Sequence, residues 1–255
     1  MINLHGILSK HRKLFSGAGM LILVALIFWT VNSPAIVGAS ATQRQLPVYS
    51  VQRSDKAAAI SFDAAWGNED TQTLIDILRE HDVRTTFFVV GDWVDKYPES
   101  VRALAEAGHE VMSHSSHHDH FSKLSSEQIR ADLTACNRKI EAVTGVSPRL
   151  FRCPYGEYDD HVITAVRDFG MEPIQWSVDS LDWKELSADE ITQRVLQGIQ
   201  PGSIVLFHNA AKHTPEALPG ILEALQERGY RIVPVSELLL DGETFLDSTG
   251  MQCRK

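Results

Sequence analysis

Between residues 57 and 235 the chain alternates short apolar runs with longer amphipathic segments. The runs have the length and the β-branched and aromatic content of buried strands, and the segments between them space their apolar residues as a helix does. Strands are expected over seven runs: 57–62, 85–90, 109–113, 150–152, 173–178, 203–207 and 231–235. Strands that alternate with helices run parallel, so the pattern predicts an α/β fold, either an α/β barrel or a doubly wound sheet.

Capping signals mark the helices between these runs. Ser125 stands three residues before Gln128, which is the spacing of a capping box, and it predicts a helix that runs to Thr144 and ends at Gly145. The same spacing predicts the start of a helix at Ser187. Further helices are expected over 71–81, 98–107, 160–169 and 215–228, with a final turn at 236–240.

The N-terminus carries a pattern that is typical of export. Basic residues within 10–13 precede an uncharged run over 18–31, and small residues at 37–41 suit signal peptidase. The run is short for a membrane span, which needs about 20 residues, although counting on to residue 37 would make it long enough. The basic flank argues against a buried core helix. We therefore expect residues 1–41 to be a signal peptide or a membrane anchor, and the protein to be extracytoplasmic, either secreted or membrane-anchored.

The remaining sequence is expected to form a linker over 42–54, one domain over 55–240 and a peripheral C-terminal tail over 241–255. The formal net charge is −9, and residues 1–53 carry five basic residues and no acid, which leaves −14 on the remainder. A domain with this much negative charge lacks the basic surface that nucleic acid requires. We therefore expect no nucleic-acid partner. The three cysteines show no CxxC spacing and indicate neither a disulfide framework nor a cysteine zinc site.

Unusual polar residues gather where the expected strands end. They are Asp63 after the first strand, His114 and His118 after the third, Arg152 at the end of the fourth, Asp179 and Asp182 after the fifth, and His208 after the sixth. The carboxyl ends of parallel strands form the rim at which α/β barrels build their active sites. Stability alone does not require acids, histidines and an arginine on one rim, so the pattern predicts a catalytic site there.

Two of these residues have the spacing of a metal site. His114 and His118 are four residues apart, so a helical turn would place both imidazoles on one face. Converging imidazoles are suitable ligands for zinc. The segment taken alone leaves a second interpretation open, a solvated histidine-rich loop that binds nothing.

Five motifs occur in a fixed order along the chain. They are Ser61-Phe62-Asp63 with Ala64, His114-Ser115-Ser116-His117-His118, Arg152-Cys153-Pro154-Tyr155-Gly156, Asp179-Ser180-Leu181-Asp182-Trp183, and Leu206-Phe207-His208. With these motifs the chain resembles the polysaccharide deacetylases of carbohydrate esterase family 4, which share the NodB homology domain. Within that family it is most similar to the exported, sporulation-associated PdaB-type branch. The resemblance covers about residues 55–240 and implies a distorted, TIM-like (β/α)7 barrel.

The resemblance implies metal-dependent hydrolysis of N-acetyl groups on an aminosugar polymer. The metal would be zinc, with cobalt or nickel as alternatives, and His114 and His118 match its ligands. Asp63 matches the general base, and His208 matches the general acid that protonates the departing amine.

Other residues of the motifs match supporting roles. Arg152 would keep Asp63 ionised, and Asp182, in preference to Asp179, would orient His208. A backbone N–H near Tyr155 would stabilise the oxyanion, and Trp183 would wall the site. Tyr155, Trp183 and Pro154 are accordingly expected on the substrate side.

The chain departs from the family pattern at one position. The family carries a second aspartate directly after the first, as a metal ligand, and this chain has Ala64 there. Catalytic zinc sites usually take three protein ligands and a water, and only two ligands are visible here. The third metal ligand could be replaced by a second water or by one of four side chains, and the sequence does not choose among them: Asp70, Glu69, His117 and Asp119.

We therefore expect an exported deacetylase that acts on cell-wall peptidoglycan or a related aminosugar polymer. Peptidoglycan is preferred to chitin because the N-terminal segment, as a signal or anchor, would place the enzyme beside a bacterial wall. Ala64 supports an alternative, a catalytically impaired relative that binds glycan or serves a structural role. A second alternative is an unrelated barrel amidohydrolase of small molecules.

Overall fold

The computed structural model describes residues 20–29 and 44–255. The chain divides into two compact units, Met1–Arg44 and Gln45–Lys255. In the first unit residues 20–29 are helical, while the predicted basic flank and signal-peptidase sites lie outside the described residues. In the described ranges 20–29 and 44–255, no helix has both the length and the apolar character for a membrane crossing.

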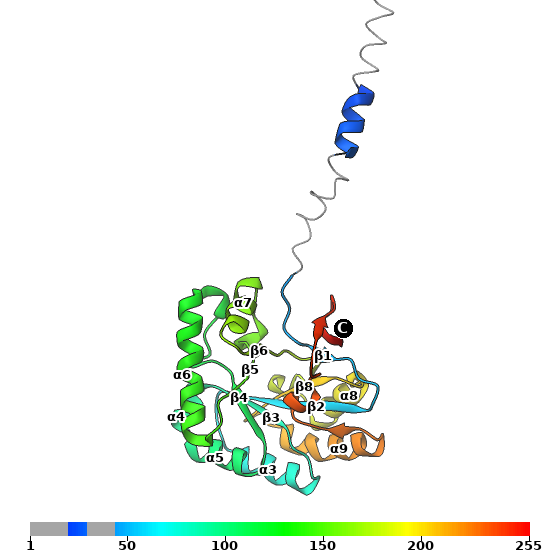
Figure 1. The fold of residues 1–255 in the computed structure, drawn as a ribbon. Helices are drawn as coiled ribbons and strands as arrows, with labels where there is room; N and C mark the ends of the chain where they lie inside the picture. Colours follow the sequence, from blue (N-terminus) through cyan, green and yellow to red (C-terminus); the bar gives the residue numbers. More distant parts are fainter. Residues whose placement is uncertain (1–19, 30–43) are drawn as a thin grey trace, which may run out of the picture. The chain divides into compact units, whose positions relative to one another are not determined.

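The second unit is built on one parallel sheet with helices around it (Figure 1). The strand order is β6-β5-β4-β3-β2-β8-β7, and β9 pairs with the start of β2. The strands are β2 (Ala57–Ala64), β3 (Thr86–Val89), β4 (Glu110–Ser113), β5 (Leu150–Phe151), β6 (Glu172–Pro173), β7 (Val178–Asp179), β8 (Ile204–His208) and β9 (Arg231–Ile232). This order confirms the predicted α/β fold as an open barrel, with β6 and β7 at its two edges.

The helices of this unit follow the capping signals closely. They are α3 (Thr71–Glu80), α4 (Gly91–Lys96), α5 (Pro98–Glu106), α6 (Ser126–Thr144), α7 (Asp160–Asp168), α8 (Ala188–Gly198), α9 (Thr214–Glu227) and α10 (Val235–Leu238). Both predicted capping boxes are present, and Gly145 ends α6 at a φ of 74°. Only α4 was not expected, because its six residues are too few to show a helical period.

Strand β2 shows how the sheet positions the site. All eight of its residues are buried, as expected of a central parallel strand that is covered on both faces. Residues 58, 60, 62 and 64 pack in the apolar cluster shared with the helices, whereas residues 57 and 59 belong to the cluster inside the barrel. Because side chains alternate along a strand, Asp63 lies on the inner side at the carboxyl end.

The run 173–178 was predicted as one strand, and that prediction is wrong. The structure divides it into β6 and β7, which lie at opposite edges of the sheet. The residues between them cross the open side of the barrel. There Val48 takes the place of a neighbouring strand, since its N–H donates to the Pro173 carbonyl (2.9 Å) and its carbonyl accepts from Gln175 N–H (2.7 Å).

The expected linker and tail also differ from the prediction, because both contribute strands. β1 (Ser50–Val51), β10 (Thr244–Leu246) and β11 (Met251–Arg254) form a separate three-stranded sheet in the order β1-β11-β10. The turn between β10 and β11 is held by Asp247, whose carboxylate accepts hydrogen bonds from the N–H groups of Thr249 and Met251. This Asx-type turn was the overlooked signal in the polar C-terminal sequence.

Gly202 provides a test of how β1 docks on the barrel. Its φ is +82°, its carbonyl accepts from Val51 N–H, and a Cβ at this position would overlap the Val51 carbonyl oxygen. We expect Gly202→Ala to lower the free energy of unfolding by about 3 kcal/mol or more, because the left-handed conformation costs about 1 kcal/mol and the overlap adds to it. Chemical denaturation measures the loss.

Gly170→Ala is the matched control. Gly170 has a similar φ of +92°, but a Cβ added there would have no neighbouring atom within 4 Å. It should lose only the conformational contribution of about 1 kcal/mol. Equal losses in the two variants would contradict a tight contact between Gly202 and β1.

Candidate active site

The loop after β4 brings His114 and His118 together. Their ring centroids lie 5.0 Å apart at an interplanar angle of 73°. The predicted helical turn is absent, since Ser115 and His118 adopt positive φ values of 74° and 59°. Ser115 Oγ accepts a hydrogen bond from His118 N–H (2.9 Å), which stabilises this tight, non-helical turn.

Burial sets the protonation of both imidazoles. His114 Nδ1 lies 2.8 Å from the Arg152 carbonyl oxygen, which can only accept, so Nδ1 carries the proton, and Nε2 faces Asp63 Oδ2 at 3.5 Å. Desolvation lowers the pKa of His114, and the nearby Asp63 charge only partly offsets it. Desolvation, followed by the charge of His114, lowers the pKa of His118 to about 4. Both rings are therefore neutral near pH 7, which is the form that binds a metal.

Ala64 leaves this pair without a third protein ligand. Ala64 is 1% exposed and packs in the cluster shared with the helices. Two of the four proposed substitutes have one side-chain atom bound to another group: Asp70 Oδ2 accepts from Ala210 N–H (2.8 Å), while its Oδ1 is buried without a hydrogen-bond partner among the described residues, and His117 Nδ1 lies 2.9 Å from an Asp92 carboxylate oxygen. The other two, Glu69 and Asp119, are exposed.

Within residues 20–29 and 44–255, no three His, Cys, Asp or Glu side chains are grouped as a metal site. The donor set therefore fits a divalent cation held by two neutral imidazoles and completed by solvent. It does not fit the three-ligand set of a catalytic zinc site.

Asp63 is held by a buried ion pair. Arg152 Nη1 donates to Asp63 Oδ1 (2.8 Å), and Nη2 donates to Ser61 Oγ (2.9 Å) and to the Gln175 carbonyl (3.2 Å). The guanidinium has no exposed surface and lies 4.1 Å from the centre of the Phe88 ring. Burial alone would raise the pKa of Asp63, but the charge of Arg152, the charges of His114 and His208 and the hydrogen bond from Arg152 together outweigh burial, so the pKa is lowered and the carboxylate stays ionised.

His208 is paired with Asp182, as the motif comparison predicts. His208 Nδ1 lies 2.8 Å from Asp182 Oδ1, while Asp182 Oδ2 accepts from His208 N–H and from Thr214 Oγ1. The Asp179 carboxylate instead accepts from Leu181 N–H in its own loop. Burial opposes the charged form of His208, but the hydrogen bond and charge of Asp182 prevail and raise its pKa.

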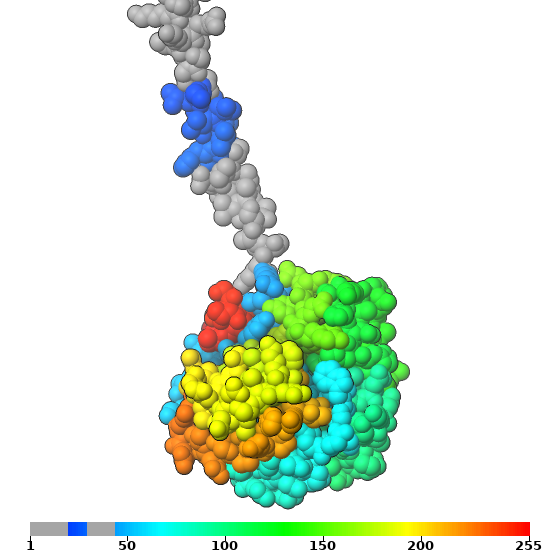
Figure 2. Space-filling view, turned by 180° about the vertical axis from the view of Figure 1, so that it is seen from behind, coloured from blue at the N-terminus to red at the C-terminus, as the bar shows by residue number. Residues whose placement is uncertain are grey.

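These side chains surround one cavity of about 470 Å³ at the rim of the barrel. Its lining is Asp63, Trp66, His114, His118, Tyr155, Gly156, Trp176, Asp179, Trp183, Leu206 and His208. On the face shown in Figure 2, the cyan segment after β2 and the yellow segment that contains α8 both contribute to the surface. The cavity thus brings together the predicted base, the predicted acid and both histidines.

Three of the predicted site residues lie behind this lining. Arg152 and Asp182 are buried and act on the cavity through Asp63 and His208. Pro154 is buried in the 3-10 turn Pro154–Gly156, and Tyr155 in that turn has a φ of 61°. Pro154 therefore shapes the turn that exposes Tyr155, and it does not itself line the cavity.

Two tryptophans of the lining, Trp66 and Trp176, were not predicted from sequence. Trp66 is 60% exposed, Tyr155 is 60% exposed and Trp183 is 57% exposed, so three large aromatic rings stand at the mouth. Trp66 packs edge-on against His118 with ring centroids 5.3 Å apart. An exposed tryptophan immediately after a strand-end acid was the available signal. Flat, amphipathic rings of this kind suit a sugar, which has apolar C–H faces and polar edges.

Known proteins of one family are similar to this chain in sequence and fold. A family model described as polysaccharide deacetylase matches residues 50–174. A chitooligosaccharide deacetylase from a Bradyrhizobium strain is 30% identical over an alignment that covers 76% of this chain and 98% of that protein. The chain belongs to the polysaccharide deacetylase family. The resemblance drawn from the five motifs is thereby confirmed at the family level, and the closer link to the PdaB-type branch stays a prediction.

Two further members illustrate the range of this polysaccharide deacetylase family. The peptidoglycan-N-acetylglucosamine deacetylase PgdA of Listeria monocytogenes is 34% identical over 83% of this chain and 46% of its own length. The crystal structure of wild-type BA3943, described as a CE4 family pseudoenzyme from Bacillus anthracis, shows 38% identity and a TM-score of 0.73. That alignment covers 76% of this chain and 68% of the other. The chain spans about half the length of two curated relatives it matches. The alignments cover 60% of YlxY from Bacillus subtilis and 46% of PgdA.

The His208–Asp182 pair should make the stability of the protein depend on pH, and this can be tested. The folded pKa of His208 is raised, so the pair stabilises the protein fully below the unfolded histidine pKa of about 6.5, and the contribution is lost as pH rises through the folded value. In Asp182→Asn, burial should prevail, and the pKa of His208 should fall below that of the unmodified protein. Titration of the imidazole signals by NMR measures this shift.

Glu216→Gln is the control, since Glu216 is an acid beside another histidine, His213, outside the cavity. It should leave the His208 titration unchanged. An unshifted His208 pKa in Asp182→Asn would show that Asp182 does not hold the proton on that ring.

Proposed function

We propose that this chain is an extracytoplasmic polysaccharide deacetylase that hydrolyses N-acetyl groups on aminosugars of cell-wall peptidoglycan. The observation that carries the proposal is the pair of buried partners behind one cavity. Arg152 favours the ionised form of Asp63, and Asp182 favours the protonated form of His208. Burying these partners is costly, and a protein that only binds glycan has little need for a base and an acid in opposite charge states.

The residues of the cavity divide the proton transfers between them. Asp63, as a carboxylate, takes the proton from the water that attacks the acetamide carbonyl. His208, as an imidazolium, gives a proton to the amine that departs when the C–N bond breaks. A divalent cation at His114 and His118, zinc or else cobalt or nickel, would polarise that carbonyl and lower the pKa of the attacking water. The aromatic rings at the mouth would hold the sugar and exclude bulk water from the reacting atoms.

Several features support peptidoglycan as the polymer and the outer side of the membrane as the location. PgdA, at 34% identity, is named for peptidoglycan, while the relative named for chitooligosaccharides is 30% identical. The basic and apolar N-terminal sequence favours export, with the segment either cleaved or retained as a membrane anchor. The resemblance to the PdaB-type branch would place the activity in sporulation.

Ala64 favours a second candidate, a catalytically impaired protein that binds glycan through the same cavity. The two-imidazole donor set lacks the third ligand of a catalytic zinc site. A related structure is described as a CE4 family pseudoenzyme, and a mutant of it, 39% identical to this chain with a TM-score of 0.72, is described as having restored enzymatic activity. Family membership argues against the other alternative, an unrelated amidohydrolase of small molecules.

The first experiment measures metal content and acetate release together. The full-length chain is purified, bound zinc, cobalt and nickel are quantified, and acetate is assayed from peptidoglycan and chitin oligomers with and without added metal. We expect acetate from peptidoglycan and none from Asp63→Asn. Glycan binding without acetate under any metal would overturn the deacetylase proposal in favour of the binding protein.

Replacing Ala64 with an acid tests the proposal that His114 and His118 bind a metal. We expect Ala64→Asp to raise zinc affinity at least about tenfold, because the family pattern places a metal-binding aspartate at this position. Without metal it should lower the free energy of unfolding by at least about 1–3 kcal/mol, because Ala64 is buried in an apolar cluster. Titration calorimetry with zinc and thermal unfolding with and without zinc measure the two effects. Ala64→Asn, of equal size but without charge, should gain much less affinity, and equal gains would contradict a charged third ligand.

Trp66 tests the aromatic mouth. We expect Trp66→Ala to raise the Kd for a peptidoglycan-derived oligosaccharide about three- to tenfold, since aromatic contacts contribute about 0.5–1.5 kcal/mol. Trp66→Phe keeps a ring and should recover most of the affinity. Unchanged affinity in Trp66→Ala, measured by calorimetry, would remove Trp66 from the sugar site.

A further inference from the structure

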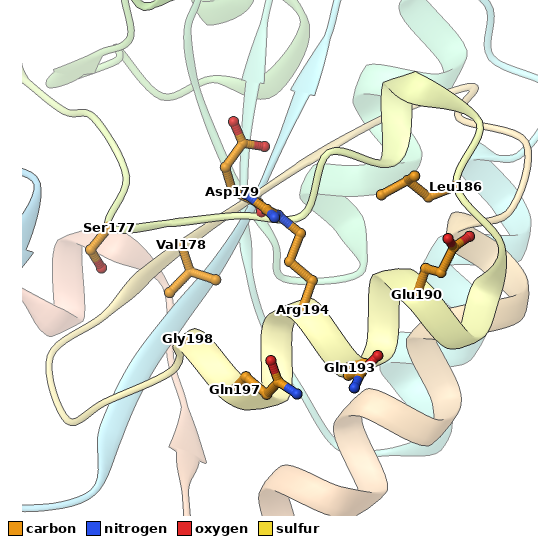
Figure 3. A pocket seen from close by; sticks show the side chains of 9 residues that line it. All are labelled: Ser177, Val178, Asp179, Leu186, Glu190, Gln193, Arg194, Gln197 and Gly198. Carbon is orange, nitrogen blue, oxygen red and sulfur yellow. The ribbon is translucent and has the colours of Figure 1, made fainter.

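A second cavity of about 550 Å³ lies between β7 and α8, and we call it the α8 groove (Figure 3). One side is formed by Ser177, Val178 and Asp179. The other side is formed by Leu186, Glu190, Gln193, Arg194, Gln197 and Gly198. Gly198 allows α8 to lie close to the strand, because a Cβ there would come within 3.2 Å of Val178.

The α8 groove and the active-site cavity have one lining residue in common. Asp179 belongs to the lining of both cavities. Its carbonyl accepts a hydrogen bond of 2.6 Å from Arg194 Nε, and its carboxylate points away from α8 in Figure 3. A polymer whose one unit fills the active-site cavity can therefore continue past Asp179 along α8.

The side chains of the α8 groove suit a neutral, hydroxyl-rich ligand. Positions 190, 193, 194 and 197 share one face of α8, and they offer two amides, a guanidinium and a carboxylate. Amides both donate and accept hydrogen bonds, as sugar hydroxyls and acetamides do. Asp179 and Glu190 outnumber Arg194, so the α8 groove does not select an anion. Its volume is within the usual range of about 300–1,000 Å³ for ligand sites.

We propose that the α8 groove is a second glycan subsite, which holds a further sugar of the same strand whose N-acetylated unit lies in the active-site cavity. The proposal rests on the glycan-binding half of the proposed function and is independent of hydrolysis. Two subsites on one strand act together, because binding at the first raises the effective concentration of the strand at the second. The protein then prefers polymers to short oligosaccharides.

Calorimetry with N-acetylglucosamine oligomers of one to six units, titrated into the full-length chain, tests the proposal. We expect affinity to rise at least about fivefold between the disaccharide and the hexamer. Gln193→Ala combined with Gln197→Ala should abolish that rise while leaving disaccharide affinity unchanged. Both glutamines are exposed, so the fold should be unaffected, which thermal unfolding verifies. Gln200→Ala, an exposed glutamine just beyond α8 and outside the α8 groove, is the matched control and should behave as the unmodified protein.

The outcomes separate the subsite from the proposed function. Equal affinity for disaccharide and hexamer, or a rise that persists in the double variant, would overturn the subsite while leaving glycan binding in place. Absence of binding at every length would overturn the subsite together with the glycan-binding function.

Discussion

The ion pair between Arg152 and Asp63 connects the site to the barrel that carries it. Arg152 follows β5, Asp63 ends the inner face of β2, and the guanidinium also binds the carbonyl of Gln175, in the crossing between β6 and β7. One fully buried side chain thus links the centre of the sheet to its open side. A charge in this position is stable only while its partners remain, because removing one partner of a buried pair costs about 3–5 kcal/mol. The arrangement that keeps Asp63 ionised is therefore part of the fold itself.

His118 and His208 line the same cavity, but their surroundings shift their pKa values in opposite directions. His118 has no carboxylate partner strong enough to overcome desolvation, so its pKa falls to about 4 and the ring stays neutral. His208 has Asp182 at hydrogen-bond distance, so its pKa rises and its protonated form is favoured. The cavity thus favours a neutral imidazole at one position and a charged imidazole at another. Among residues 20–29 and 44–255, no third His, Cys, Asp or Glu side chain joins the two imidazoles as a possible metal site.

The sequence predicted those parts of the molecule that local patterns determine. Capping boxes at Ser125 and Ser187 located two helices, and the polar residues at strand ends located the rim, including Asp63 and His208. The misses arose from long-range pairing. The run 173–178 looks like one strand, but Val48, more than a hundred residues away, pairs with it and separates its halves. The loop of His114 and His118 could not be predicted either, since its positive φ values occur at Ser and His rather than at glycine.

The segment that precedes the barrel is bonded to the rest of the domain at several points. Backbone N–H groups within residues 48–52 donate to the carbonyls of Pro173, Gly250, Gly202 and Gln252, and β1 runs parallel to β11. Tension applied to the chain before residue 45 would reach the barrel through these bonds. In a parallel pair, such a load acts along the strands and shears several hydrogen bonds at once instead of opening them one by one. If the N-terminus is held while the domain works on a rigid polymer, β1 would bear the strain and spare the cavity at the rim.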